Sequence, residues 1–320
     1  MLYAQAFKAF DERNFKKATK LWRKAIKKSK SLNDNELLGK LYLGLGMGYA
    51  QDREYTEALT SFQQALELYK KIKNSLEQAH SMYFIGKMYL KLKNYEMANK
   101  NYRNALEIAQ ELRNQELQAD ILFDLGSVAA LAKKYNKSMN IYRQSLKIYR
   151  KIEKLIEQGE IYFEIGKILR EMDSEHYVEA LKNFRQALKI MVKERQHKSE
   201  IDCRIQIGDL LLLTDQPQEA FNHYEKAIKK SKLSKDVLGE INAYFGKGKA
   251  LFELKQYQKS INIFHSILEF YQKIKYLKGE ISCLTYLSNS YDKLGDAELT
   301  KKYKKLAQDK AKKIEKNNKS

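Results

Sequence analysis

The feature that most constrains this chain is a small residue that recurs at a nearly fixed interval. Glycine occupies this position in six successive copies, at Gly46, Gly86, Gly126, Gly166, Gly208 and Gly248. The same ladder extends backwards to Ala6 and forwards to Ser288. Self-similarity with a period of this length is typical of repeat arrays, in which one supersecondary unit is stacked many times. We therefore expect about eight copies of one unit.

Three other positions keep the same register and lie in what should be the second helix of each unit. An aromatic residue follows the small residue by sixteen positions, with small residues four before it and three after it. In the second copy these are Ala58, Phe62 and Ala65, and a two-residue insertion before Tyr177 interrupts the otherwise even spacing. Small side chains let two helices approach closely, and a glycine inside a helix, which costs about 0.5–1 kcal/mol, persists where a side chain would clash. The pattern predicts a helical hairpin whose glycine and aromatic residue pack together.

This pattern resembles the tetratricopeptide repeat, in which a W-x2-LG-x2-Y helix is followed by an A-x3-F-x2-A helix. Gly46 and Tyr49 match the first helix, and the three residues just named match the second. The departure from that family is length, because the unit here has 40 residues instead of 34, and we expect the second helix to run on, as in Tyr55–Lys73. Long units of this kind resemble those of Pins-type polarity adaptors, kinesin light chains and Rap-type regulators, which bind peptides or proteins.

The resemblance implies an all-α fold, a right-handed superhelical solenoid of about eight helical hairpins whose first helices line the concave face. One Pro and 14 Gly in 320 residues leave few breaks in helical sequence. We expect a single solenoid over residues 1–313, with units near 1–34, 35–74, 75–114, 115–154, 155–196, 197–236, 237–276 and 277–313. A basic tail, residues 314–320, is expected to fray.

Nothing in the sequence points to catalysis. The five histidines are scattered without ligand spacing, and Cys203 and Cys283 share one register of the first helix, so we expect them to pack in the core. The run Gly44–Gly48 lies within a predicted helix and follows no strand, which excludes a dinucleotide fingerprint. We therefore expect no enzyme activity, no cofactor and no metal site. No apolar run is long enough to span a bilayer, and we expect a cytoplasmic protein.

The resemblance also indicates a partner-binding groove, formed by first-helix side chains on the face opposite the glycine. The candidate residues are Tyr83, Lys87, Asp120, Phe123, Asp124, Glu160, Phe163, Glu164, Lys167, Arg170, Asp202, Asp209, Phe245 and Lys249, and Gln206 and Asn242 lie in the same set of positions. The four aromatic members share one register, where they either form an apolar floor for a ligand or pack against neighbouring helices. The six carboxylates either attract a basic peptide or belong to a solvated face.

The leading prediction is a non-enzymatic adaptor that binds a partner peptide, extended or helical, in this groove. The alternative is RNA or polyanion binding through the basic second helices and the ends, since the first 40 residues carry 11 Lys and Arg against 4 Asp and Glu. One later second helix is crowded by Lys226, Lys229, Lys230, Lys232 and Lys235. No aromatic residues for base stacking are interleaved with these lysines. End-to-end self-assembly of the repeats is a third possibility.

Overall fold

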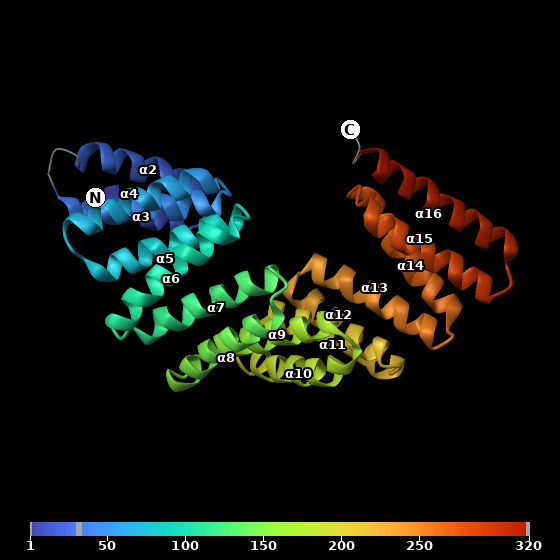
Figure 1. The fold of residues 1–320 in the computed structure, drawn as a ribbon. Helices are drawn as coiled ribbons and strands as arrows, with labels where there is room; N and C mark the ends of the chain where they lie inside the picture. Colours follow the sequence, from blue (N-terminus) through green and yellow to red (C-terminus); the bar gives the residue numbers. More distant parts are fainter. Residues whose placement is uncertain (1, 30–33, 318–320) are drawn as a thin grey trace. The chain divides into compact units, whose positions relative to one another are not determined.

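The computed structural model describes residues 2–29 and 34–317, and the part of the chain that it describes is helical, with no strand. It forms two compact units, Met1–Glu157 and Gln158–Ser320. The helices of the first unit are α1 (Leu2–Asp11), α2 (Phe15–Ser29), α3 (Asn35–Gln51), α4 (Tyr55–Lys71), α5 (Ser75–Lys91), α6 (Tyr95–Glu111), α7 (Gln115–Leu131) and α8 (Tyr135–Lys151) (Figure 1). Consecutive helices of this unit pack as antiparallel hairpins.

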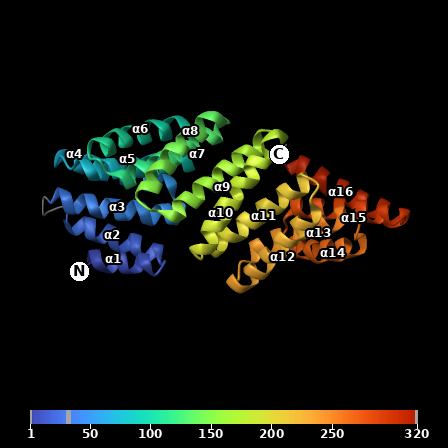
Figure 2. The same cartoon turned by 90° about the horizontal axis from the view of Figure 1, so that it is seen from below.

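The border between the units falls inside α9 (Leu155–Met172), most of which belongs to the second unit. The second unit continues with α10 (Tyr177–Lys193), α11 (His197–Leu213), α12 (Pro217–Ser234), α13 (Val237–Glu253), α14 (Tyr257–Lys273), α15 (Leu277–Lys293) and α16 (Ala297–Asn317) (Figure 2). The helix α16 thus reaches into the segment expected to fray. The right-handed winding and the continuity of the whole array stay predictions.

In the second, third and fourth repeats the two helices are equally long, whereas α1 and α2 have 10 and 15 residues and α15 and α16 have 17 and 21. In the second repeat α3 and α4 have 17 residues each, and α5 and α6 repeat these lengths. The expectation that the extra length lies in the second helix alone is wrong, because α4 ends at Lys71 and Lys73 lies in the following turn with φ +55°. Each of these three repeats therefore consists of two matched helices joined by a three-residue turn.

Most of the described turns end the preceding helix with the same backbone geometry, and the 3-10 turn after α9 is an exception. A residue in the left-handed region follows the helix, and the next amide closes the turn, as when the N–H of Asn74 donates to the carbonyl of Tyr69 at 3.0 Å. The side chain of the same Asn74 then caps the next helix by accepting from the N–H of Glu77. Asn94 and Asn114 repeat both roles. The chain therefore turns without proline and almost without glycine.

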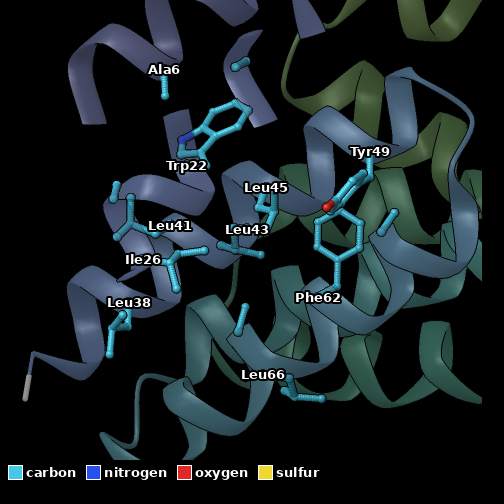
Figure 3. Packing of buried hydrophobic residues seen from close by; sticks show 14 of the residues in the cluster. Ala6, Trp22, Ile26, Leu38, Leu41, Leu43, Leu45, Tyr49, Phe62 and Leu66 are labelled. Carbon is cyan, nitrogen blue, oxygen red and sulfur yellow. The ribbon is translucent and has the colours of Figure 1, made fainter. Parts of the chain in front are cut away.

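The predicted contact between glycine and aromatic residue holds every central hairpin together. A Cβ added to Gly46 would lie 2.6 Å from the Phe62 ring, and one added to Gly86 would lie 2.6 Å from the Tyr102 ring. The matching pairs are Gly126 with Tyr142, Gly166 with Phe184, Gly208 with Tyr224 and Gly248 with Phe264. Figure 3 shows Phe62 and Trp22 within the apolar core of the first repeats. Glycine at these positions therefore leaves the space that the aromatic rings occupy.

The insertion and the cysteines also lie where the sequence places them. A 3-10 turn, Ser174–His176, stands between α9 and α10 and accommodates the two extra residues before Tyr177. Cys203 and Cys283 are free, buried thiols, and burial raises the pKa of each to about 12. They are packing residues, as predicted.

Candidate functional site

The candidate residues all lie on first helices of the repeats. In the first unit, α5 carries Tyr83 and Lys87, and α7 carries Asp120, Phe123 and Asp124. In the second unit, the candidates on α9 are Glu160, Phe163, Glu164, Lys167 and Arg170, those on α11 are Asp202 and Asp209, and those on α13 are Phe245 and Lys249. The candidates are thus divided between the two units.

The four aromatic candidates pack against the second helix of their own hairpin. The ring-centroid distances are 5.9 Å for Tyr83 and Tyr102, 5.5 Å for Phe123 and Tyr142, 5.5 Å for Phe163 and Phe184, and 5.4 Å for Phe245 and Phe264. These partners are the rings that fill the glycine gaps. The four aromatic candidates therefore extend the hairpin core towards the surface, and only their exposed ring edges are accessible to a ligand.

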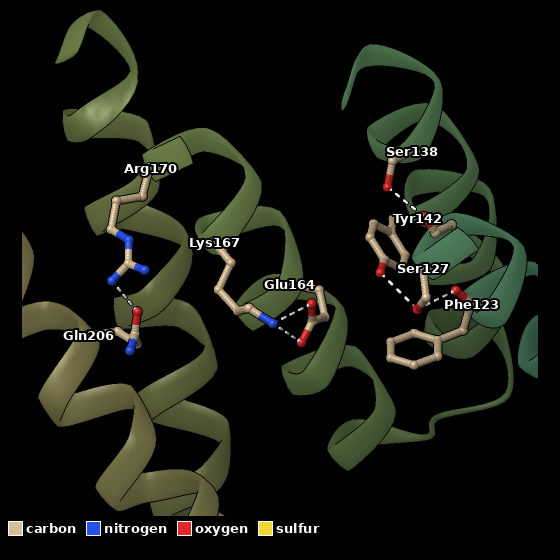
Figure 4. A network of polar contacts seen from close by, with 9 residues as sticks. Phe123, Ser127, Ser138, Tyr142, Glu164, Lys167, Arg170 and Gln206 are labelled. Carbon is tan, nitrogen blue, oxygen red and sulfur yellow. Dashed lines mark hydrogen bonds and ion pairs between the residues drawn. The ribbon is translucent and has the colours of Figure 1, made fainter. Parts of the chain in front are cut away.

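Three lysines cover three of these four rings and form ion pairs with carboxylates at the same time. The ammonium groups of Lys87, Lys167 and Lys249 lie 4.9, 5.8 and 5.9 Å from the ring centroids of Tyr83, Phe163 and Phe245. Their nearest carboxylate oxygens are at 3.8 Å in Asp124, 2.9 Å in Glu164 and 2.7 Å in Asp209. Figure 4 shows the pair formed by Lys167 and Glu164. Part of the predicted acidic character is therefore balanced within the protein.

The two carboxylates of α7 are built into the first unit. Asp124 is only 8% exposed, and this burial raises the pKa of its carboxyl group, although Lys87 opposes the shift. Asp120 accepts a hydrogen bond from the Tyr149 hydroxyl at 2.5 Å, and burial also raises the pKa of Asp120. These side chains stiffen α7 against its neighbours more than they offer charge to a partner.

The second unit holds its polar candidates more openly. Asp209 accepts from the Tyr224 hydroxyl at 2.8 Å as well as from Lys249, and Arg170 donates to the amide oxygen of Gln206 (Figure 4). Burial raises the pKa of Asp202. Glu160 lies exposed on α9. This unit therefore carries charged groups that a partner can reach.

Cavities open between successive first helices at matching positions of the two units. The cavity in the second unit has a volume of about 400 Å³ and includes the candidates Asp209, Phe245 and Lys249 together with Gln206 and Asn242. The one in the first unit, of about 240 Å³, includes Tyr83 and Asp120. Sequence reasoning missed the wall that α14 and α15 supply to the larger cavity, made by Tyr271, Tyr276 and Lys278. Since these residues flank a turn, the groove register of the first helices did not include them.

Neither a metal centre nor a membrane span is found in the described part of the chain. Among those residues, no group of three or more His, Cys, Asp or Glu side chains could hold a metal ion. No described helix is both long enough and apolar enough to cross a bilayer.

The comparison with known families decides the assignment of the repeats. A family model described as tetratricopeptide repeat matches residues 37–111, 77–151 and 157–232. The chain belongs to the tetratricopeptide repeat (TPR) family. A comparison with curated proteins finds no match.

Solved structures of other TPR-type proteins share the fold at low sequence identity. The quorum sensor NprR from B. thuringiensis, in its apo form, is 13% identical with a TM-score of 0.74, over 97% of this chain and 86% of that protein. The apo form of RapI is 14% identical with a TM-score of 0.70, over 94% and 82%. The Rap conjugation gene regulator of plasmid pLS20 in complex with the Phr* peptide is 19% identical with a TM-score of 0.55, over 90% and 77%. At these identities the likeness concerns the fold.

Proposed function

We propose that this TPR protein is a non-enzymatic adaptor that binds a peptide segment of a partner protein along its first helices. The observation that carries the proposal is the cavity of about 400 Å³ in the second unit, where three of the candidate residues meet. A concave site with an apolar wall and a few polar groups is the usual form of a binding site.

The chemistry of this cavity suits an extended peptide. Gln206 and Asn242 each carry both a hydrogen-bond donor and an acceptor, which is what a peptide backbone requires. Phe245 and Tyr271 supply apolar surface for one side chain of the ligand. The pair formed by Asp209 and Lys249 adds a charged group of each sign at the same place.

The structural relatives favour a peptide as the class of ligand. One Rap regulator similar to this chain is in complex with the Phr* peptide, and another Rap protein is complexed with competence and sporulation factor. No contact among the described residues favours the alternative of RNA binding through the basic helices, which stays a prediction.

The experiment begins with affinity purification of the full chain from its native host and identification of the bound protein by mass. The binding segment is then synthesised, and its dissociation constant is measured by fluorescence anisotropy. We expect Asn242→Ala to weaken binding about tenfold, because hydrogen bonds to the peptide backbone are lost. Asn222→Ala, an exposed asparagine of the second helix α12, is the matched control and should change nothing. Equal affinity of the wild type and Asn242→Ala would refute the proposal.

We further propose that the bound segment is basic and competes with Lys249 for Asp209. Lys249→Gln frees the carboxylate and should strengthen binding, whereas Asp209→Asn should weaken it. Asparagine can still accept from the Tyr224 hydroxyl, so the local structure is preserved. The opposite order of affinities would assign an acidic segment to the site.

A further inference from the structure

A second cavity, separate from the proposed peptide site, opens between α13 and α14 of the second unit. Its volume is about 540 Å³, and its lining is mainly apolar, with Ile241, Tyr244, Ile263, Ile267 and Phe270 among its residues. No residue lines both this cavity and the one that contains Asp209. We call it the α13–α14 groove.

The groove is open to solvent at the start of α13. Val237 lines the groove and is 57% exposed, and the neighbouring Leu238 is 67% exposed. An exposed apolar surface that continues into a cavity is a mark of an interaction site.

The sequence distinguishes this hairpin from the other described ones at the position of the groove. In the α7–α8 hairpin the two helices are in close contact at the position that corresponds to the groove. There the Ser145 hydroxyl donates to the carbonyl of Ala119 at 2.7 Å. The matching pair in the α13–α14 hairpin is Ile241 and Ile267, two branched side chains. Every other described hairpin from α3 onward has at least one small residue in the pair: Gly39 with Ala65, Ala79 with Ala105, Gly159 with Ala187, Ile201 with Ala227, and Ile281 with Ala307.

The opening is local and leaves the hairpin intact. Further along α13, a Cβ added to Gly248 would still meet the Phe264 ring at 2.8 Å, as in the other repeats. The two isoleucines therefore separate one end of a hairpin whose other end is closely packed, and the groove lies at the separated end.

One edge of the groove is basic. The Lys232 ammonium group, at the end of α12, lies 3.8 Å from the Glu240 carboxylate and 5.5 Å from the Tyr244 ring centroid, and both of those residues line the groove. Lys229 lies one helical turn earlier on the same face of α12 and is exposed. Glu240 balances only one of these charges, so the edge retains a positive surplus.

We propose that the α13–α14 groove docks an amphipathic helix of a partner protein, with its apolar side in the groove and acidic residues facing Lys229 and Lys232. Each wall offers about two helical turns, Val237 to Tyr244 and Asn262 to Phe270, which matches apolar anchors spaced i, i+3 or i+4, and i+7. Charge complementarity at the edge selects the acidic form of such a helix. This docking site does not depend on the proposed peptide site.

The test uses the full chain and three labelled peptides of about 14 residues, measured by fluorescence anisotropy at about 0.15 M salt. The first peptide has leucines at helical anchor spacing and glutamates elsewhere, the second has lysines in place of the glutamates, and the third has the first composition with the leucine positions shuffled. We expect the first peptide to bind, and the other two to bind at least tenfold more weakly.

Two protein variants should each reduce binding of the first peptide at least tenfold. Val237→Glu places a charge at the mouth of the groove, and Lys232→Glu reverses the charge of its edge. The matched controls are Val178→Glu, at a 79% exposed valine of α10, and Lys182→Glu on the same helix. Both controls should bind as the wild type does, and circular dichroism should show equal helix content in all four variants.

Equal binding of the shuffled peptide, or equal losses in the control variants, would overturn the proposal. Binding of single-stranded RNA or of anionic vesicles that falls with Lys232→Glu but not with Val237→Glu would also overturn it, because the edge would then serve a polyanion without the groove.

Discussion

The contact between a glycine and an aromatic ring sets the spacing of the two helices in each hairpin. Phe62 is 1% exposed, and its ring occupies the volume that a side chain at Gly46 would need. Protein interiors are close-packed, so a fully enclosed ring has little room to move aside. The cost of the helical glycine is offset by the burial of the ring.

A double-mutant cycle at this contact tests its role. Gly46→Ala removes an unfavourable helical glycine but places a methyl group 2.6 Å from the Phe62 ring, and overpacking of this kind costs about 1–3 kcal/mol. We expect a net loss of about 1–2 kcal/mol in the free energy of unfolding, measured by urea denaturation. Phe62→Leu vacates part of the volume, so the double variant should lose clearly less than the sum of the single variants. Additive losses would contradict the interpretation.

One position of the first helix changes chemically along the array. In the third and fourth repeats it is a half-buried glutamine, and the amides of Gln78 and Gln118 donate to the carbonyls of Tyr69 and Ala109. In the second unit the matching residue at Glu200 is a carboxylate, 5% exposed, which binds Arg204 at 2.9 Å and Lys230 at 3.1 Å. Glu280 repeats this arrangement with Lys310. The neutral hydrogen bond of these earlier repeats is thus replaced by a buried ion pair at Glu200 and Glu280.

Most of the turns after the helices share one backbone conformation, which the residue types at these positions do not indicate. In twelve described turns a residue other than glycine adopts the left-handed conformation, most often as the second residue after the helix, and in ten of the twelve it is lysine or arginine. An L-residue in that conformation costs about 1–2 kcal/mol. The sequence therefore retains strain at its turns that glycine would relieve.

Replacing one such residue should stabilise the protein. Lys133 has φ +56° in the turn between α7 and α8 and is exposed. We expect Lys133→Gly to raise the free energy of unfolding by about 0.5–1 kcal/mol, since relief of the strain outweighs the greater entropy of glycine in the unfolded chain. Lys133→Ala keeps the Cβ and is the control, for which no gain is expected. The free energy of unfolding of both variants is measured by urea denaturation. If Lys133→Ala stabilised the protein as much as Lys133→Gly does, the explanation would be refuted.

The helices, and the helix face on which each candidate residue lies, could be predicted because the same sequence period recurs in every repeat. The pairs that side chains form between neighbouring repeats could not be predicted from that period. The register placed Asp209 and Phe245 on the right helices, and the cavity in the second unit brings them together. The sequence did not reveal that Lys249 pairs with Asp209, because that pair depends on the distance between α11 and α13. The exceptional isoleucine at Ile267, visible in the sequence, was the signal for the α13–α14 groove, but its meaning required the structure.

The two units should respond differently to acid. His223 of the second unit is largely buried, and this burial lowers its pKa to about 4. Arg204, Lys226 and Arg185 act in the same direction, and Glu219 opposes them. The neutral histidine is therefore favoured in the folded state, while in the unfolded chain it binds a proton below about pH 6.5. Since the unfolded state then holds more protons, the stability of the second unit falls as the pH drops from 6.5 towards 4.

The carboxylates of Glu200, Asp124 and Asp202 also affect the pH dependence of stability, and they do so in opposite directions. Burial tends to raise the pKa of Glu200, but the combined salt bridges with Arg204 and Lys230 lower it overall, so the stabilising contribution of Glu200 is lost only as the pH falls further. Burial raises the pKa of Asp124 in the first unit and of Asp202 in the second, and each therefore favours the folded state in acid. Between pH 7 and 5, His223 should dominate in the second unit, with a loss of about 2 kcal/mol.

Thermal unfolding followed by two probes can separate the units. The single tryptophan, Trp22, is fully buried in the first unit, so its fluorescence reports that unit, whereas far-UV circular dichroism reports all helices. At pH 5 we expect part of the circular dichroism transition to move about 4–8 °C below its position at pH 7, while the Trp22 transition does not follow it. His223→Ile introduces the residue that the same register carries at Ile141 and Ile263, and it should abolish most of the shift. If this variant retains the full shift, the histidine is not its cause, and the buried ion pairs of Glu200 and Glu280 become the groups to test.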